Sequence, residues 1–194
     1  MLYPSIVQGT GLMVAPEKMG VWAYPYPHVF ERRGDDNIFT EDYIRSMRDG
    51  EQTIFNMVTG LCGVLYLSGR IDKADDVNFA LIREGTQFYL QNREFLMRAH
   101  PVYPSGFASI SDEKTPVVYG LKDGEEMLLA VWRREGPQET AIDLTKYFRT
   151  PQVRLAYPAH CPTKYSLRDG NLIVELPKLN TARMFRIRED SLKI

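Results

Sequence analysis

The chain has 194 residues, of which 44% are hydrophobic and 25% charged, and its 24 basic and 25 acidic side chains leave a formal net charge of -1. This composition is typical of a folded globular protein and excludes disorder, which needs low hydrophobicity or high net charge. A nearly neutral chain offers no electrostatic basis for binding nucleic acid or an anionic membrane. Two cysteines are too few for a disulfide framework, so a cytoplasmic location is expected.

The first half of the chain alternates short apolar runs with helical patterns. The runs at 11–15 and 21–24 each end at a proline and are typical of strands. Thr40 is a plausible N-cap for a helix over 41–48. A second helix is expected over 51–58. This part of the chain therefore begins with strands and continues with helices.

A strand and a long helix complete the first half. Residues 64–67 form an apolar run bounded by Gly63 and by Ser68-Gly69, which predicts a buried strand. Apolar side chains recur at helical spacing over 73–98, with Asp72 in the position of a cap and Pro101 limiting any continuation. The order strand, helix, strand, helix predicts a parallel α/β arrangement.

The second half of the chain has the pattern of an antiparallel β structure. Asp123-Gly124 and Asp169-Gly170 each separate two strand-like runs, which is a strong hairpin signal because both turn residues must tolerate positive φ. Further strands are expected over 138–143, 152–157 and 182–187. Short strands separated by turns are typical of an antiparallel β-sandwich.

The common patterns for metal, cofactor and nucleophile chemistry are missing from the sequence. The three histidines are far apart and no Cys-x-x-Cys or His-x-x-x-His pair occurs, so we expect no metal and no cofactor. Cys62 adjoins an apolar run and is expected to be a buried small hydrophobe. Cys161 lies in a proline-flanked loop with nothing nearby in sequence to lower its pKa. Adjacent acidic pairs such as Asp75-Asp76 are expected to serve helix starts or turns.

An aromatic cluster is the most suggestive functional feature. Trp22, Tyr24, Tyr26 and His28 follow one another where a strand leaves the α/β half. Ligands bind at such strand ends in parallel sheets, and the rings could stack on the face of a sugar. We therefore take these four residues as candidate substrate-binding residues. The alternative is that they pack between the two halves of the chain.

Four stretches together carry a family resemblance. Residues 3–20 contain a Gly-Thr pair, a proline and a closing Met-Gly in register with one family segment. Residues 63–68 and 88–93 are similar to a strand and to the end of the helix after it. The last stretch, from 167 to 187, looks like the family's closing strands. In this order, they resemble the C-terminal part of the α-galactosidases (melibiases) of glycoside hydrolase family 36.

The resemblance implies a fold and a division of the chain. Residues 1–100 would be the last two β/α units of a (β/α)8 TIM barrel, and residues 101–194 an antiparallel β-sandwich. The family hydrolyses terminal α-linked galactosides with two aspartates and retention of configuration. Its Lys-x-Asp nucleophile and Ser-Asp-Asp acid/base segments are expected to be absent here, so no catalytic residue is assigned. Where the family has Met-Gly-Ala-His, Trp22 stands in place of the histidine, so the sugar specificity stays open.

Two interpretations of different classes follow. In the first, the chain contributes part of a glycosidase and works with a missing N-terminal barrel segment or as a homo-oligomer, with a carbohydrate as ligand. In the second, it is a non-catalytic carbohydrate-binding or interaction module built on the sandwich. Exposure of Tyr119, Trp132, Tyr147 and Tyr157 would favour the module, whereas burial of these rings would mean that they belong to the core.

Overall fold

A computed structural model describes residues 3–26, 49–69 and 71–190. The helix expected over 41–48 and its cap Thr40 lie outside these residues, as does His28. The described elements are α1 (Tyr3–Thr10), a 3₁₀ turn (Pro16–Lys18), β1 (Gly20–Tyr26), α3 (Glu51–Gly60), β2 (Val64–Gly69), a second 3₁₀ turn (Ile71–Lys73), α4 (Asp76–Arg98), β3 (His100–Val102), β4 (Val117–Asp123), β5 (Glu126–Arg133), β6 (Glu139–Asp143), β7 (Pro151–Tyr157), β8 (Lys164–Arg168), β9 (Asn171–Glu175) and β10 (Thr181–Glu189).

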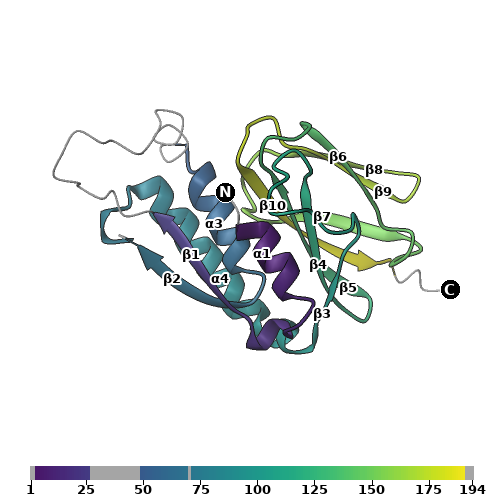
Figure 1. Cartoon of the computed structure of the whole chain (residues 1–194), viewed down its shortest axis with the longest axis horizontal. Coiled ribbons are helices and arrows are strands. Elements are labelled where there is room, and N and C mark those ends of the chain that lie inside the picture. Colours follow the sequence, from purple (N-terminus) through teal and green to yellow (C-terminus); the bar gives the residue numbers. More distant parts are fainter. Residues whose placement is uncertain (1–2, 27–48, 70, 191–194) are drawn as a thin grey trace.

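These elements form layers. Strands β1 and β2 pair in parallel, and the helices lie between this pair and the antiparallel sheets (Figure 1). The first antiparallel sheet has the strand order β3-β4-β5-β10-β7, and the second has β6-β9-β8. The described part of the chain is thus a mixed helix and sheet structure in which the antiparallel strands all follow residue 99. None of the described helices is long and apolar enough to cross a membrane.

The helical half differs from the sequence expectation in four places. Strand β2 was expected to be buried, but it has no fully buried residue, and Tyr66 and Leu67 are exposed, because helices cover only one face of the parallel pair. The run at 11–15 is not a strand, because it contains the turn that ends α1, and α1 itself was not predicted. There Gly11 lies against the Tyr119 ring, and a Cβ at this position would be 2.4 Å from the Tyr119 hydroxyl. Helix α4 is capped by Asp75 and not by Asp72, because the Asp75 carboxylate accepts the backbone N–H of Asn78 at 2.8 Å.

Both predicted hairpins form, but only one has the predicted turn. In the β8–β9 hairpin, Arg168 pairs with Asn171, and Asp169 and Gly170 have φ of 48° and 75°. In the β4–β5 hairpin, Asp123 is still a paired strand residue and Gly124 is the first turn residue, with φ of 53°. The turn therefore lies one residue later than the Asp-Gly signal predicts.

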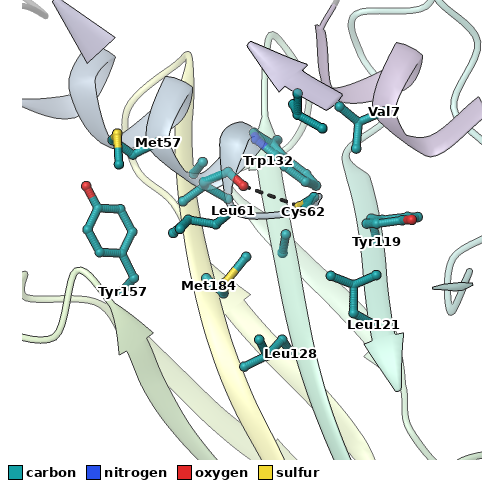
Figure 2. Close-up of a cluster of buried hydrophobic side chains, with 14 of the residues drawn as sticks. Val7, Met57, Leu61, Cys62, Tyr119, Leu121, Leu128, Trp132, Tyr157 and Met184 are labelled. Atoms are coloured by element: carbon teal, nitrogen blue, oxygen red, sulfur yellow. Dashed lines mark hydrogen bonds between the residues drawn. The ribbon is translucent and has the colours of Figure 1, made fainter. Parts of the chain in front are cut away.

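Two apolar clusters stabilise these layers. The first, the shared core, combines side chains of β1, α3 and α4 with side chains of β4, β5 and β10. Figure 2 shows Met57 of α3 beside Tyr157, and Leu61, the residue that follows α3, near Trp132 and Met184 of the sheet in this core. The second, the inter-sheet core, contains residues of both antiparallel sheets, including β6 and β9. The division of the chain at residue 100 therefore passes through the shared core, and it remains a proposal.

One buried side chain ties α1 to the antiparallel half. The Gln8 amide donates to the carbonyls of Gly106 (2.8 Å) and Val118 (3.0 Å), and its oxygen accepts the N–H of Ala108 (2.9 Å). All of its polar atoms therefore have partners, which is what a buried amide requires. Helix α1 is held in place by this residue against strand β4 and the loop before it.

Candidate functional site

The outer face of the parallel pair carries an aromatic row, which we define as Trp22, Tyr24 and Tyr66. Val21 and Ala23 of β1 point to α3 and are buried, so the alternating residues Trp22 and Tyr24 lie on the opposite face. Trp22 is 56% exposed and Tyr66 is 48% exposed. These large rings are therefore on the surface of the chain and not between its two halves.

The rings of the aromatic row lie against one another. Trp22 and Tyr24 are nearly parallel, with an interplanar angle of 16° and ring centroids 6.2 Å apart. Trp22 and Tyr66 are direct neighbours in the parallel register, with centroids 5.7 Å apart. The Tyr66 ring also lies across Gly20, where a Cβ would meet it at 2.5 Å. Such an exposed flat surface can stack on an apolar face of a ligand.

The aromatic row contains only part of the predicted site. Trp22 and Tyr24 are brought together as expected. Tyr26 ends β1, and its side chain is not among those described; His28 lies outside the described residues. Tyr66 was not predicted as a site residue, because its proximity to Trp22 follows from the strand register and not from the sequence spacing. The only available signal was that Tyr66 lies in the second predicted strand of the parallel half.

A buried polar network lies at the carboxyl end of β1. The Thr53 hydroxyl is 2.6 Å from the Pro25 carbonyl and 2.5 Å from the Asn78 side-chain oxygen. Asn78 in turn donates to both oxygens of Asp75, at 3.0 and 2.9 Å. The starts of α3 and α4 are thereby tied to the end of β1. This network gives the strand end a fixed position, as a binding site at that end would need.

One short sequence match bears on catalysis. Lys73-Ala74-Asp75 fits the letters Lys-x-Asp, so the expectation that this pattern is absent was wrong. Asp75, however, is the N-cap of α4, and both of its oxygens accept hydrogen bonds from Asn78. Its carboxylate therefore has a structural role. Across residues 3–26, 49–69 and 71–190, no group of three or more His, Cys, Asp or Glu could hold a metal ion.

The two cysteines are in different environments. Cys62 is fully buried at the end of α3, and burial raises the pKa of its thiol far above the ordinary value. Cys161 is half-buried, and burial also raises the pKa of its thiol. Contrary to the sequence expectation, a group that opposes this shift lies close by, because the Arg183 guanidinium donates to the Cys161 sulfur at 3.0 Å. The raised pKa still argues against a nucleophilic thiolate at either position.

A cavity of about 710 Å³ lies between the start of α3 and the antiparallel sheets. Its base contains a buried ion pair, in which Arg183 Nη1 and Nη2 are 2.7 and 2.8 Å from the two carboxylate oxygens of Glu51. Arg183 also donates from Nε to Thr163 at 2.9 Å. These partners satisfy both charged groups, so the pair anchors α3 to β10. The sequence holds no signal for it, because the two residues are 132 positions apart.

The aromatic residues proposed for a sandwich binding surface belong to the core. Tyr119, Trp132 and Tyr157 are all 0% exposed, and Tyr147 is partly buried against the inter-sheet core. Trp132 donates from Nε1 to Thr59 of α3 at 3.2 Å, and the Tyr157 hydroxyl lies 3.1 Å from the Leu81 carbonyl of α4. Their polar ends therefore join the helical half to the sheet. Core packing is the correct interpretation for these residues.

Comparison with known proteins gives a likeness of fold. No family model matches the sequence, and no curated protein matches it. Among solved structures, the chain superposes on the galactosidase domain of the α-galactosidase–sucrose kinase AgaSK with a TM-score of 0.64 and 15% identity. That match covers 96% of this chain and 24% of the other. An α-amylase from Geobacillus thermoleovorans, complexed with acarbose, matches with a TM-score of 0.51 and 10% identity over 73% of this chain and 34% of the amylase.

These similarities concern the fold class and the share of each neighbour that the chain covers. Both neighbours are glycosidase structures, so the mixed helix and sheet arrangement of this chain is one found in glycosidase domains. At identities of 15% and 10%, the likeness concerns the fold alone. The chain spans about a quarter of the galactosidase domain and about a third of the amylase.

Proposed function

We propose that this chain forms the closing part of a retaining glycoside hydrolase of the α-galactosidase type. Residues 1–100 would supply the last two β/α units of a (β/α)8 barrel, and residues 101–194 an antiparallel β-sandwich beside it. The observation that carries the proposal is the parallel pair β1–β2, with helices on one face and the aromatic row on the other. In a barrel of this type, the face opposite the helices is the interior, and substrates bind at the carboxyl ends of the strands.

The exposed strands support the idea of a larger assembly. A barrel closes only when all its strands are present with matched tilt and shear, and two strands cannot do this. A parallel strand pair with an exposed apolar face also needs cover, because α/β sheets are normally buried on both faces. We therefore propose that the remaining strands come from polypeptide beyond these 194 residues or from a second copy. The two catalytic aspartates would come from polypeptide beyond these 194 residues, because none is assigned to this chain and a second copy would not provide them.

In this assembly the aromatic row and its neighbours would bind the sugar. Trp22 and Tyr24 would present their flat faces towards the strand ends, and Tyr26 and His28 remain proposed sugar-binding residues. The departure from the family's histidine at Trp22 leaves the identity of the sugar open. A terminal α-linked galactoside is the substrate that the resemblance favours.

The alternative, a stand-alone module on the sandwich, lacks its main support. The aromatic residues that would have formed its surface are buried in the two cores. Among the described residues, the three-stranded sheet does expose part of Tyr165, but its hydroxyl accepts the Leu155 N–H at 3.3 Å and its ring packs on Phe185. We therefore do not favour this function.

Tryptophan fluorescence tests the sugar site directly. The chain has two tryptophans, and only Trp22 is exposed. We expect an α-galactoside such as melibiose to change the emission in a saturable way, and Trp22→Phe to abolish the change. Maltose serves as the control sugar. If melibiose causes no saturable change of emission in the wild-type chain, the aromatic row does not bind the galactoside.

Turnover tests the catalytic part of the proposal. We expect the purified chain to leave 4-nitrophenyl α-galactoside intact, because the catalytic carboxylates are not assigned to it. Robust hydrolysis, with a pH profile of two carboxyl groups, would show that the chain is catalytically complete. Sedimentation of the same sample would show whether the aromatic row drives self-association, and Trp22→Ala should then reduce it.

A further inference from the structure

Three arginines meet on the helix-facing side of the five-stranded sheet, beyond the end of the shared core. Arg186 and Arg188 alternate along β10, so they lie on the same face, and Arg154 of β7 is the direct partner of Arg186 in the antiparallel register. Together with Gln152 and Val153 they line a pocket of about 230 Å³. This arginine pocket is separate from the aromatic row and from the cavity at Arg183.

The charges in the arginine pocket are only partly compensated. Glu126 of β5 accepts from Arg186, and its carboxylate oxygens are 3.2 Å from Arg188 Nη2. Among the described residues, Arg154 has no carboxylate partner, since Glu126 is engaged by the other two. Three guanidinium groups and one carboxylate thus leave two uncompensated positive charges.

Contacts hold the Arg186 side chain in place, and one of its donor atoms has no hydrogen-bond partner. Its side chain is 12% exposed, it donates to the Asn92 side-chain oxygen of α4, and it lies over the Phe88 ring with 5.9 Å to the centroid. Its Nε is buried and has no partner. Burial lowers the pKa of Arg186, and the positive charges of Arg154 and Arg188 lower it as well. The negative charge of Glu126 raises it, but not enough to reverse the shift. An anion in the pocket would relieve this repulsion.

We propose that the arginine pocket binds the dianionic phosphate group of a small phosphate monoester. Arginine is suited to this role, because its planar fork donates parallel hydrogen bonds to phosphate oxygens. A phosphate monoester carries between about 1.5 and 2 negative charges at neutral pH, which matches the two uncompensated positive charges of the pocket. A carboxylate or a phosphodiester carries only one. The proposal does not depend on the proposed glycosidase function.

Calorimetric titration of the whole chain with methyl phosphate, dimethyl phosphate and inorganic phosphate tests this site. At pH 7.5 and constant ionic strength, methyl phosphate and inorganic phosphate should bind saturably, and the monoanionic dimethyl phosphate at least about tenfold more weakly, as expected if one charged hydrogen bond is lost. Arg154→Gln should weaken methyl phosphate binding by a similar factor. Arg154 is exposed, so this variant should keep the thermal midpoint of the wild type.

Arg168→Gln is the matched control, because Arg168 is an exposed arginine on β8 outside the arginine pocket. It should bind methyl phosphate like the wild type. Equal affinity for the monoester and the diester, or equal losses in the two variants, would overturn the proposal. So would the absence of phosphate binding together with a change in self-association in Arg154→Gln, since the arginines would then form a protein contact.

Discussion

The parallel pair and the five-stranded sheet each carry one of the two tryptophans, and the two side chains have opposite environments. Trp22 of β1 is 56% exposed, whereas Trp132 of β5 is completely buried and bonded to α3. The antiparallel sheets cover one another through the inter-sheet core, and the larger one also covers the helices. The described residues cover the parallel pair on its helix side only. Among the described residues, the five-stranded sheet is therefore covered on both faces, whereas the parallel pair has one exposed face.

The two tryptophans give the largest expected contrast. Trp132→Ala should lower the free energy of unfolding by about 3–5 kcal/mol, because it empties a site in the shared core. Trp22→Ala should change it by less than about 1 kcal/mol, because the ring is largely exposed. Denaturant unfolding of both variants measures the two values. Similar losses would mean that the aromatic row is part of the stabilising core.

The buried pair Glu51–Arg183 tests how firmly the two halves are joined. Arg183→Leu should cost about 3–5 kcal/mol of unfolding free energy, since it leaves the Glu51 carboxylate buried without its cation. The double variant with Glu51→Leu should recover most of the loss. Lys164 and Glu175, 3.5 Å apart and largely exposed at the lysine, provide the control pair. Lys164→Ala should cost less than about 1 kcal/mol.

Gly60 tests the packing within the helical half. It lies where α3 crosses the parallel pair, and a Cβ there would be 2.8 Å from the Cβ of Ala23 and 2.5 Å from Leu65. Gly60→Ala should destabilise the chain by about 1–2 kcal/mol, because overpacking outweighs the better helix propensity of alanine. Chemical denaturation provides the measurement. A stabilised variant would mean that the parallel pair can move away from α3 at no cost.

The smallest expected effect concerns the β4–β5 turn. Gly124 has φ of 53° with open space around its Cα, so Gly124→Ala should cost only about 1 kcal/mol of backbone strain. Gly170→Ala should cost more, because its Cβ would also lie 2.4 Å from Thr145. The thermal midpoints of the Gly124→Ala and Gly170→Ala variants measure this difference in stability. Equal shifts would mean that Thr145 can turn away.

Local patterns predicted the regular elements better than the contacts between them. The helical spacing of α4 and the turn signals between the antiparallel strands are properties of single segments, so the sequence alone was sufficient for them. Asp72 and Asp75 both have the residue type of a cap, and only the three-dimensional position of Asn78 decides between them. The run at 11–15 has strand composition, but it contains the turn that ends α1, where Gly11 lies against Tyr119.

The sites were predicted only where the residues follow one another along the chain. Trp22 and Tyr24 are two residues apart on one strand, and their shared face follows from alternation. Tyr66 joins them through the register between β1 and β2, which no local pattern specifies. Arg186 and Arg188 also alternate visibly, but the contribution of Arg154 depends on the register between β7 and β10. Pairings of this kind are set by the whole fold.

The separation between Glu51 and Arg183 has a consequence for synthesis in the cell. A ribosome adds about 5–20 residues per second, so the 132 residues between α3 and its partner on β10 take on the order of ten seconds to appear. During that interval, β10 is not yet available to complete the sheet that covers the helices in the shared core. Chaperone binding to the unfinished chain should therefore concentrate on α3 and α4, and it should end once β10 has left the exit tunnel.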